Sequence, residues 1–280
     1  MDEKTELHSR PGISGGALRS LILALVLIPW TVLWGSWAIV FGILGSGRMP
    51  TWGITVWSRG ILLISGVRVE VIRKGELKPD QPYVFFINHQ SALDIPILFQ
   101  ACRGHQQIRF MAKESLFKIP FIGWGMSLTG FIPIRRENAR HSAEQVQGLK
   151  QSKKSFGYSY IVFPEGTRSP DGRLQAFKKG SIGMAQRLGL PLAPVTIVDA
   201  CRANPKGTYR VRTGTVRVVF HEPIPIAADA PAIQGRAARD ALAQNIFDTV
   251  ASALPEEQKP LPQIPANDSQ DEQAQKLVTR

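Results

Sequence analysis

The sequence predicts an α/β protein, in which a layered domain with a mostly parallel or mixed sheet flanked by helices follows an N-terminal membrane-embedded helical pair. Two observations carry this prediction. From about residue 67, short β-rich runs alternate with helical stretches, which is the pattern of an α/β layered domain. Before that point, residues 20–47 contain no charged side chain, and this run is long enough to cross a bilayer.

The strand candidates are short runs rich in β-branched and aromatic residues: 67–72, 83–87, 108–111, 131–134, 160–163, 192–198 and 215–220. The helix candidates lie between or after them: 92–102, 138–154, 176–188 and 235–253. We therefore predict a polar leader with the helical pair over residues 1–66 and the α/β domain over 67–253. The tail, residues 254–280, is rich in Pro, Gln and acidic residues, which predicts disorder.

The uncharged run 20–47 has two features of a membrane segment. Its tryptophans suit an interfacial belt: Trp30, Trp34 and Trp37. Pro29 predicts either a kink or a hairpin that dips into the bilayer and returns. The second apolar segment, residues 52–67, carries a charge at Arg59 and is short for a span, so we interpret it as an interfacial or re-entrant helix.

The formal net charge is +12, which attracts negatively charged partners such as nucleic acid, anionic lipid or phosphorylated substrates. The chain has no clustered basic helix and no aromatic-basic strand pattern, so we expect no nucleic-acid partner. Cys102 and Cys201 fit no metal-binding spacing, and the histidines are scattered, so we expect no metal site. With so few cysteines, a cytosolic catalytic face is the simpler assumption.

The first candidate site follows strand 83–87, where residues 88–94 read NHQSALD. His89 can accept a proton near neutral pH, and the Asp94 carboxylate can orient its ring and stabilise the imidazolium. In one regular helix, residues five apart are rotated by about 140° and do not share a face. The pair can therefore meet only if His89 lies on the turn before the helix, with Ser91 as N-cap. From these residues alone, a catalytic dyad and a turn histidine with a capping acid are equally good interpretations.

The second candidate site, residues 163–169, reads FPEGTRS at the end of strand 160–163. Gly166 allows a sharp turn that exposes backbone N–H groups to an anion, and Arg168 offers a planar fork for phosphate. Glu165 could orient Arg168 or a substrate hydroxyl. The alternative is a surface turn with a solvated salt bridge.

The third candidate is the stretch 113–136, which begins with Lys113, is apolar in its middle and ends with Arg135 and Arg136. Basic groups that flank an apolar segment suit a ligand with a phosphate at one end and an acyl chain at the other. On its own, this stretch is better explained by a core helix that has ordinary flanking charges.

Taken together, the three segments resemble the glycerolipid acyltransferases, specifically the bacterial type of 1-acyl-sn-glycerol-3-phosphate acyltransferase. The NHxxxxD motif stands as Asn88, His89 and Asp94, and FPEGTRS is matched in full at residues 163–169. The other two motifs resemble residues 113–135 and the run LAPV at 192–195. The resemblance covers roughly residues 55–225.

This resemblance implies acyl transfer to the sn-2 hydroxyl of 1-acyl-sn-glycerol 3-phosphate, giving phosphatidate, with His89 as general base and Asp94 as its orienting acid. It implies substrate binding by the remaining motif residues: Lys113, Arg135, Glu165, Gly166, Thr167 and Arg168. No cofactor is expected, because acyl-CoA or an acyl carrier protein thioester is a co-substrate. The expected partners are a lysophospholipid, the acyl thioester and the bilayer, at the inner membrane with the catalytic domain on the cytoplasmic face.

Four alternatives differ in what they require of the sequence. A serine hydrolase needs a nucleophile elbow, but the GxSxG match at residues 12–16 lies in the polar leader and follows no strand. A nucleic-acid-binding protein lacks the basic patterns named above. A non-catalytic lipid-binding protein would function without His89. An acyltransferase for another lyso-lipid, such as lyso-ornithine lipid or a headgroup-bearing lysophospholipid, keeps every motif and differs only in its acceptor.

Overall fold

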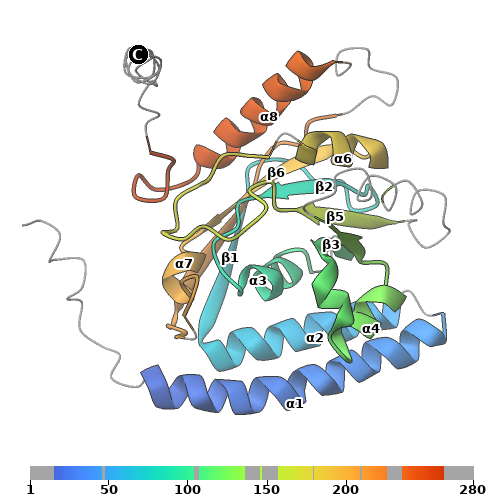
Figure 1. Cartoon of the computed structure of the whole chain (residues 1–280). Helices are drawn as coiled ribbons and strands as arrows, with labels where there is room; N and C mark the ends of the chain where they lie inside the picture. The colour runs from blue at the N-terminus through green and yellow to red at the C-terminus, as the bar shows by residue number, and fades with distance from the viewer. Residues whose placement is uncertain are drawn as a thin grey trace, which may run out of the picture.

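The computed structural model describes residues 16–45, 48–103, 107–135, 146, 157–178, 180–208, 210–225 and 235–261. It confirms the predicted fold class, a mixed 7-stranded sheet with helices on both faces (Figure 1). The strands are β1 (Val67–Arg73), β2 (Val84–Ile87), β3 (Gln107–Lys113), β4 (Ile132–Ile134), β5 (Tyr158–Val162), β6 (Leu192–Val198) and β7 (Gly214–Phe220). All the predicted strands are present, with ends that shift by one or two residues.

The strand order is β1-β7-β6-β2-β5-β3-β4. Neighbouring strands are parallel except for β6 and β7, which are antiparallel. Five strands, from β6 across to β4, consequently end at the same edge of the sheet. Loops at that edge can converge on one site, as is usual in α/β proteins.

The two faces of the sheet are both buried, and β2 shows why. Phe85 and Ile87 belong to one hydrophobic cluster, whereas Val84 and Phe86 belong to the other, because successive side chains in a strand point to opposite faces. The first cluster also contains residues of α2 (Arg48–Ser65) and α3 (Asp94–Ala101). The second contains residues of α6 (Gly180–Leu188) and α8 (Arg236–Ala251), which lie on the opposite face of the sheet (Figure 1).

Helix α1 (Gly16–Ile43) lies along α2 at the base of the molecule (Figure 1). At 1.5 Å per residue, it is about 42 Å long. It continues through Pro29, so the hairpin alternative is wrong. Within the described part of the chain, Leu25–Ile43 is the one helical window long and apolar enough to cross a membrane, and only 6% of it is buried.

The tryptophans of α1 lie against α2. Trp34 makes edge contacts with Trp30 and Trp52, with ring centroids 5.5 and 5.6 Å apart. Gly53 and Gly60 of α2 give room for such rings, since a Cβ at either glycine would lie within 2.6 Å of one. The position of the tryptophans at a membrane interface stays a prediction, and aliphatic side chains cover the exposed side of α1 and the turn after it: Leu25, Ile28, Leu33, Ile43 and Leu44.

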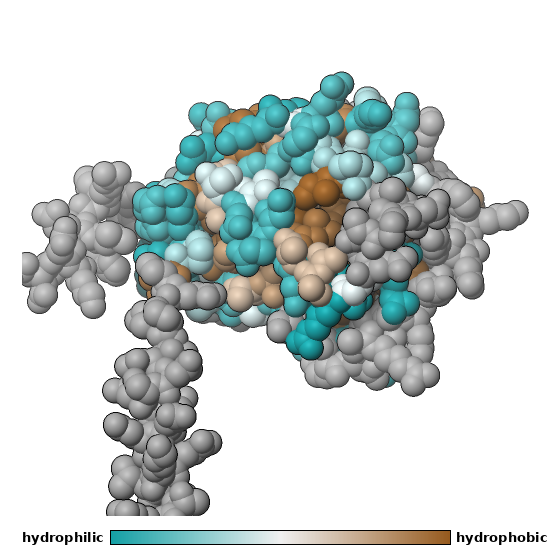
Figure 2. Space-filling view, turned by 90° about the horizontal axis from the view of Figure 1, so that it is seen from above, coloured by the Kyte–Doolittle hydropathy of each residue, from teal (hydrophilic) through white to brown (hydrophobic). Residues whose placement is uncertain are grey.

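The opposite side of the molecule has a different character. Figure 2 looks down on the α6–α8 side and shows a mostly hydrophilic surface with a limited hydrophobic patch. The exposed large hydrophobic side chains of the described residues are concentrated in α1, α2 and the segment 116–124. The molecule thus has an apolar base and a polar top.

Three further short helices lie among the described residues: η2 (Glu114–Lys118), α4 (Ile122–Leu128) and α7 (Ala200–Ala203). The predicted helices near 92–102, 176–188 and 235–253 correspond to α3, α6 and α8, whereas the one at 138–154 lies outside the described residues except for residue 146. Leu254 and Gln258 are 3% and 2% exposed, so packing continues beyond the predicted domain boundary at residue 253. Residues 1–15 and 262–280 lie outside the described residues.

Candidate active site

The turn that carries His89 is fixed to the sheet by the residue before it. The Asn88 side chain donates to the Ile197 carbonyl at 2.8 Å and accepts from the Ile197 N–H at 2.7 Å. These bonds imitate a backbone pair between β2 and β6, just past the end of β2. Asn88 therefore determines where the chain leaves the sheet, although sequence reasoning gave it no function.

His89 and Asp94 meet as the sequence required, with the histidine on the turn and Asp94 at the first residue of α3. His89 Nδ1 lies 2.7 Å from Asp94 Oδ2. That oxygen also accepts the backbone N–H groups of Gln90 at 2.8 Å and Ser91 at 3.0 Å. The Asp94 side chain is completely buried, whereas that of His89 is 14% exposed. No hydrogen-bond partner for His89 Nε2 occurs among the described residues, which leaves this nitrogen available to a substrate.

The predicted N-cap is wrong by two residues. Leu93 occupies the N-cap position and makes no side-chain cap bond. The Ser91 hydroxyl instead accepts the Leu93 N–H at 3.1 Å and donates to the Asn204 carbonyl at 2.9 Å. The helix starts late because the Asp94 carboxylate already binds the N–H groups of the preceding turn.

The loop 163–169 holds the same histidine from the other side. The His89 N–H donates to Glu165 Oε1 at 2.7 Å, and the Ser169 N–H donates to the His89 carbonyl at 2.8 Å. The Phe163 ring stacks on the imidazole, with centroids 4.0 Å apart and planes at 15°. Two candidate sites that are separate in sequence are therefore one assembly at the carboxyl ends of β2 and β5.

Glu165 lies beneath this assembly and is only 3% exposed. Its second oxygen accepts the Gln175 N–H at 3.2 Å. Burial raises the pKa of the Glu165 carboxyl to about 8, although the two backbone donors partly oppose this shift. Both carboxylate oxygens of Glu165 therefore accept backbone N–H groups, one of which is that of His89. Glu165 thus supports the His89 backbone.

Gly166 has the left-handed conformation that the predicted sharp turn requires, with φ of 73°. A Cβ at this position would lie 2.7 Å from the Lys178 side chain. The next residue, Thr167, is exposed. The Arg168 carbonyl accepts a 2.6 Å hydrogen bond from Lys206 Nζ. Lys178 beside Gly166 and Lys206 beside Arg168 thus add positive charge to this loop, which no motif indicated.

Lys113 and Arg135 lie at the carboxyl ends of β3 and β4, on the same sheet edge as His89. Both are exposed, and Arg135 donates two hydrogen bonds to the Glu114 carboxylate, at 2.6 and 2.8 Å. The structure therefore brings the two basic residues to the correct edge but not into contact with the histidine turn. Arg136 lies outside the described residues.

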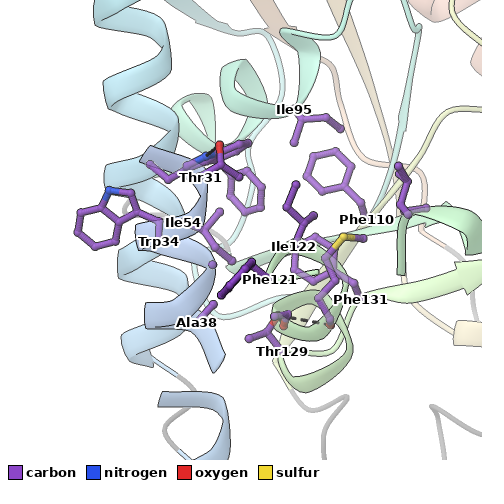
Figure 3. A pocket seen from close by; sticks show the side chains of 17 residues that line it. Thr31, Trp34, Ala38, Ile54, Ile95, Phe110, Phe121, Ile122, Thr129 and Phe131 are labelled. Carbon is purple, nitrogen blue, oxygen red and sulfur yellow. Dashed lines mark hydrogen bonds between the residues drawn. The ribbon is translucent and has the colours of Figure 1, made fainter. Parts of the chain in front are cut away.

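An apolar cavity of about 250 Å³ opens between α1, α2, α4 and β3, and Figure 3 shows its lining side chains. Trp34 and Ala38 come from α1, and Phe110 comes from β3. The Phe110 ring lies 6.0 Å from that of Phe163, which in turn stacks on His89. Aromatic side chains thus lead from the histidine to the cavity. Part of the stretch 113–136 forms the wall, as its apolar composition predicted.

This arrangement agrees with the comparisons to known proteins. The profile described as Acyltransferase matches residues 68–198. The crystal structure of the 1-acyl-sn-glycerophosphate (LPA) acyltransferase PlsC from Thermotoga maritima is similar, with a TM-score of 0.64 and 26% identity over 84% of this chain and 95% of that chain. The chain is therefore similar to acyltransferases in sequence over residues 68–198 and in fold over most of its length.

The relatives share a more specific name. A 1-acyl-sn-glycerol-3-phosphate acyltransferase of Pseudomonas aeruginosa is 29% identical, over 73% of this chain and 79% of that protein. The protein of the same name from Chlamydomonas reinhardtii is 36% identical over 68% of this chain, and the chloroplastic BAT2 of Brassica napus is 40% identical over 52%. These two matches span only 54% and 41% of those relatives' own lengths.

Proposed function

We propose that this protein transfers a fatty acyl chain from acyl-CoA or acyl carrier protein to the sn-2 hydroxyl of 1-acyl-sn-glycerol 3-phosphate, giving phosphatidate. The observation that carries the proposal is the His89–Asp94 pair at 2.7 Å, joined through stacked aromatic rings to an apolar cavity. A base and a lipid-binding space in one site are what direct acyl transfer to a lysophospholipid requires.

In this mechanism, His89 Nε2 accepts the proton of the acceptor hydroxyl as its oxygen attacks the thioester carbonyl. Asp94 holds the Nδ1–H and stabilises the imidazolium. The new C–O bond forms, the C–S bond breaks, and the imidazolium returns its proton to the departing thiolate. The acceptor is the nucleophile, so no acyl-enzyme forms, and the thioester serves as a co-substrate without any resident cofactor. General base catalysis of this kind contributes about 10²–10⁴-fold in rate.

The developing oxyanion needs hydrogen-bond donors next to the imidazole. In the loop 163–169, the N–H groups of Gly166 and Ser169 already bind protein carbonyls. Those of Thr167 and Arg168 make no hydrogen bond within the described part of the protein. These two groups are therefore our candidates for the oxyanion site.

For the acceptor phosphate we propose Arg168, with Lys113 and Arg135 from the neighbouring strands. All three lie at the edge of the sheet that holds His89. The guanidinium of Arg168 can bind two phosphate oxygens at once. The nearby Lys206 and the net charge of +12 favour an anionic acceptor over a zwitterionic one.

We further propose that the apolar base of the molecule lies in a membrane. The exposed aliphatic side of α1 would contact the lipid, and the cavity, whose wall includes Trp34 and Ala38 of the same helix, would receive an acyl chain from the leaflet. The thioester would arrive from the aqueous side. For a bacterial cell this arrangement corresponds to the inner membrane, with the catalytic domain facing the cytoplasm.

The choice of acceptor can be tested with the purified protein in detergent, palmitoyl-CoA and a panel of lyso-lipids. Mass spectrometry should show phosphatidate from 1-acyl-sn-glycerol 3-phosphate and at least tenfold slower acylation of lysophosphatidylcholine and lyso-ornithine lipid. Arg168→Gln should raise the KM for lysophosphatidate, whereas Arg236→Gln, at an exposed position on α8, should not. Preferential acylation of a headgroup-bearing or ornithine lipid would contradict the proposal.

A further inference from the structure

The segment after α8, residues 254–261, returns to the back of the catalytic turn and brings a buried glutamine with it. Gln258 is 2% exposed, and its backbone carbonyl accepts the Leu174 N–H at 2.9 Å. A polar side chain is rarely buried this deeply unless it is hydrogen-bonded, so its partners show what it does.

Gln258 joins two loops of the site. Its Oε1 accepts a 2.9 Å hydrogen bond from Gln90 Nε2 and a 3.3 Å bond from the Asp199 N–H. Its Nε2 donates to Asp199 Oδ1 at 2.7 Å. Gln90, which is 1% exposed, also donates to the Gly172 carbonyl at 2.9 Å. The segment 254–261 is thereby connected to the residue next to His89.

We infer that Gln258 is a positioning residue for the catalytic histidine, acting through Gln90. The backbone N–H of Gln90 is one of the groups that hold Asp94 Oδ2, and the same oxygen orients the His89 ring. Without Gln258, the Gln90 side chain loses a buried partner, and the turn that aligns histidine and aspartate is free to shift. This inference rests on the proposed function, since it assigns His89 the reacting nitrogen.

Glu257, the residue before Gln258, makes an exposed contact instead of a buried one and therefore provides a control. Glu257 pairs with Arg202 at 2.5 Å, but both side chains are more than half exposed, and such a pair contributes little to stability. Arg202 also pairs with Asp199 at 3.3 Å, and removing the Glu257 side chain takes away neither that pair nor the hydrogen bond between Gln258 and Gln90. Glu257→Ala is therefore the matched variant on the same segment.

The test compares Gln258→Glu, the double variant Gln258→Glu with Asp199→Asn, and Glu257→Ala. In the single variant, the new carboxylate faces Asp199 and loses the donor. In the double variant, the amide and the carboxylate exchange places, so each hydrogen bond of Gln258 can re-form. We measure kcat and KM for lysophosphatidate, the melting temperature, and hydrogen exchange of a peptide spanning residues 85–94 by mass spectrometry.

We expect Gln258→Glu to lower kcat by about 10- to 100-fold, with KM changed less than about threefold, because a small misplacement of a reacting group has effects of this size. Hydrogen exchange of the 85–94 peptide should accelerate. The double variant should regain kcat to within about threefold of the native value, and Glu257→Ala should match the native protein.

Three results would overturn the inference: a native kcat in the single variant, no recovery in a double variant that melts at the native temperature, or an equal loss in Glu257→Ala. If Gln258→Glu does not fold, the kcat of the double variant and the hydrogen-exchange rate of its 85–94 peptide still test the inference. Hydrogen exchange needs no substrate, so it separates this inference from the proposed function. Unchanged exchange in Gln258→Glu contradicts the inference even if the native protein proves inactive on lysophosphatidate.

Discussion

The histidine turn and the apolar cavity are joined through aromatic rings, yet they are built by opposite means. Around the turn, directional hydrogen bonds hold Asp94 Oδ2 and the backbone of His89, which is bonded to Glu165 and Ser169. The cavity is lined mainly by apolar side chains from α1, α2, α4 and β3, with few hydrogen bonds among them, such as the one that Trp57 Nε1 donates to the Thr31 hydroxyl at 3.1 Å. Hydrogen bonds are directional, whereas apolar packing depends on volume. Changes in the turn should therefore alter the rate, and changes in the cavity should alter which chain is accepted.

The largest effect is expected at Asp94. Asp94→Asn should lower kcat by about 10²–10⁴-fold, because the amide cannot stabilise the imidazolium. The KM values should change little, since Asp94 is completely buried and cannot touch a substrate. Steady-state kinetics would show this, with Asp80→Asn, an exposed position before β2, as control. If Asp94→Asn kept a third of the native kcat, the turn would not control the rate, and the contrast with the cavity would be wrong.

A cavity substitution should instead shift chain-length preference. Gly125 of α4 lines the cavity, and a Cβ there would lie 3.3 Å from Ala38 and 3.5 Å from the Gly35 carbonyl. Gly125→Leu should occupy the space of about two methylene groups, at about 0.8 kcal/mol each, and lower kcat/KM for the longest chains by about tenfold. Short chains should be affected less than threefold.

Thioester and acceptor chain lengths must be varied separately, because either chain could occupy the cavity. If the chain-length preference shifts in only one of these series, the acyl chain of that substrate is the one that occupies the cavity. The control is Gly183→Leu on α6, where a new Cβ would meet only Arg239, at 3.8 Å. A uniform loss across all chain lengths in both series would contradict a cavity that selects by volume.

The third prediction concerns the support beneath the turn. Burial raises the pKa of Glu165 from 4.5 to about 8, so between these values the folded protein holds a proton that the unfolded chain has released. The free energy of unfolding should therefore fall as the pH rises from about 4.5 to 8, by at most about 1.4 kcal/mol per pH unit from this group. Denaturant unfolding of native protein and Glu165→Gln at several pH values would measure it. Equal slopes in the two proteins would show that Glu165 does not titrate in this range.

The smallest effect is expected at the sheet edge. Arg135→Gln should raise the KM for lysophosphatidate by about threefold without changing kcat, because an exposed ion pair is weak in water. Glu114→Gln should lower that KM slightly, since Glu114 competes with the acceptor phosphate for the same guanidinium. If Arg135→Gln lowers kcat instead of raising the KM, the prediction is wrong, and Arg135 affects the reaction rate as the residues of the histidine turn do.

The sequence predicted the strands well because β2 and β6 are nearly continuous apolar runs buried on both faces. It also predicted that His89 and Asp94 could meet only across a turn. It could not predict Gln258, which lies 168 residues from Gln90, inside a tail whose composition indicated disorder. It did not predict that Trp30 and Trp37 pack against α2, because composition does not show that Gly60 and Gly53 provide space for their rings. Local patterns specify elements, whereas long-range contacts determine which side chain supports which.

The central claim is that His89 transfers the proton directly between acceptor and thiolate. The most direct test is thiol release from acyl-CoA by the purified protein, with and without lysophosphatidate, beside His89→Ala. We predict release only when the acceptor is present, and a loss of about 10²–10⁴-fold in the variant. Thiol release without acceptor would indicate an acyl-enzyme or hydrolysis, and near-native activity of His89→Ala would contradict the assignment of the base.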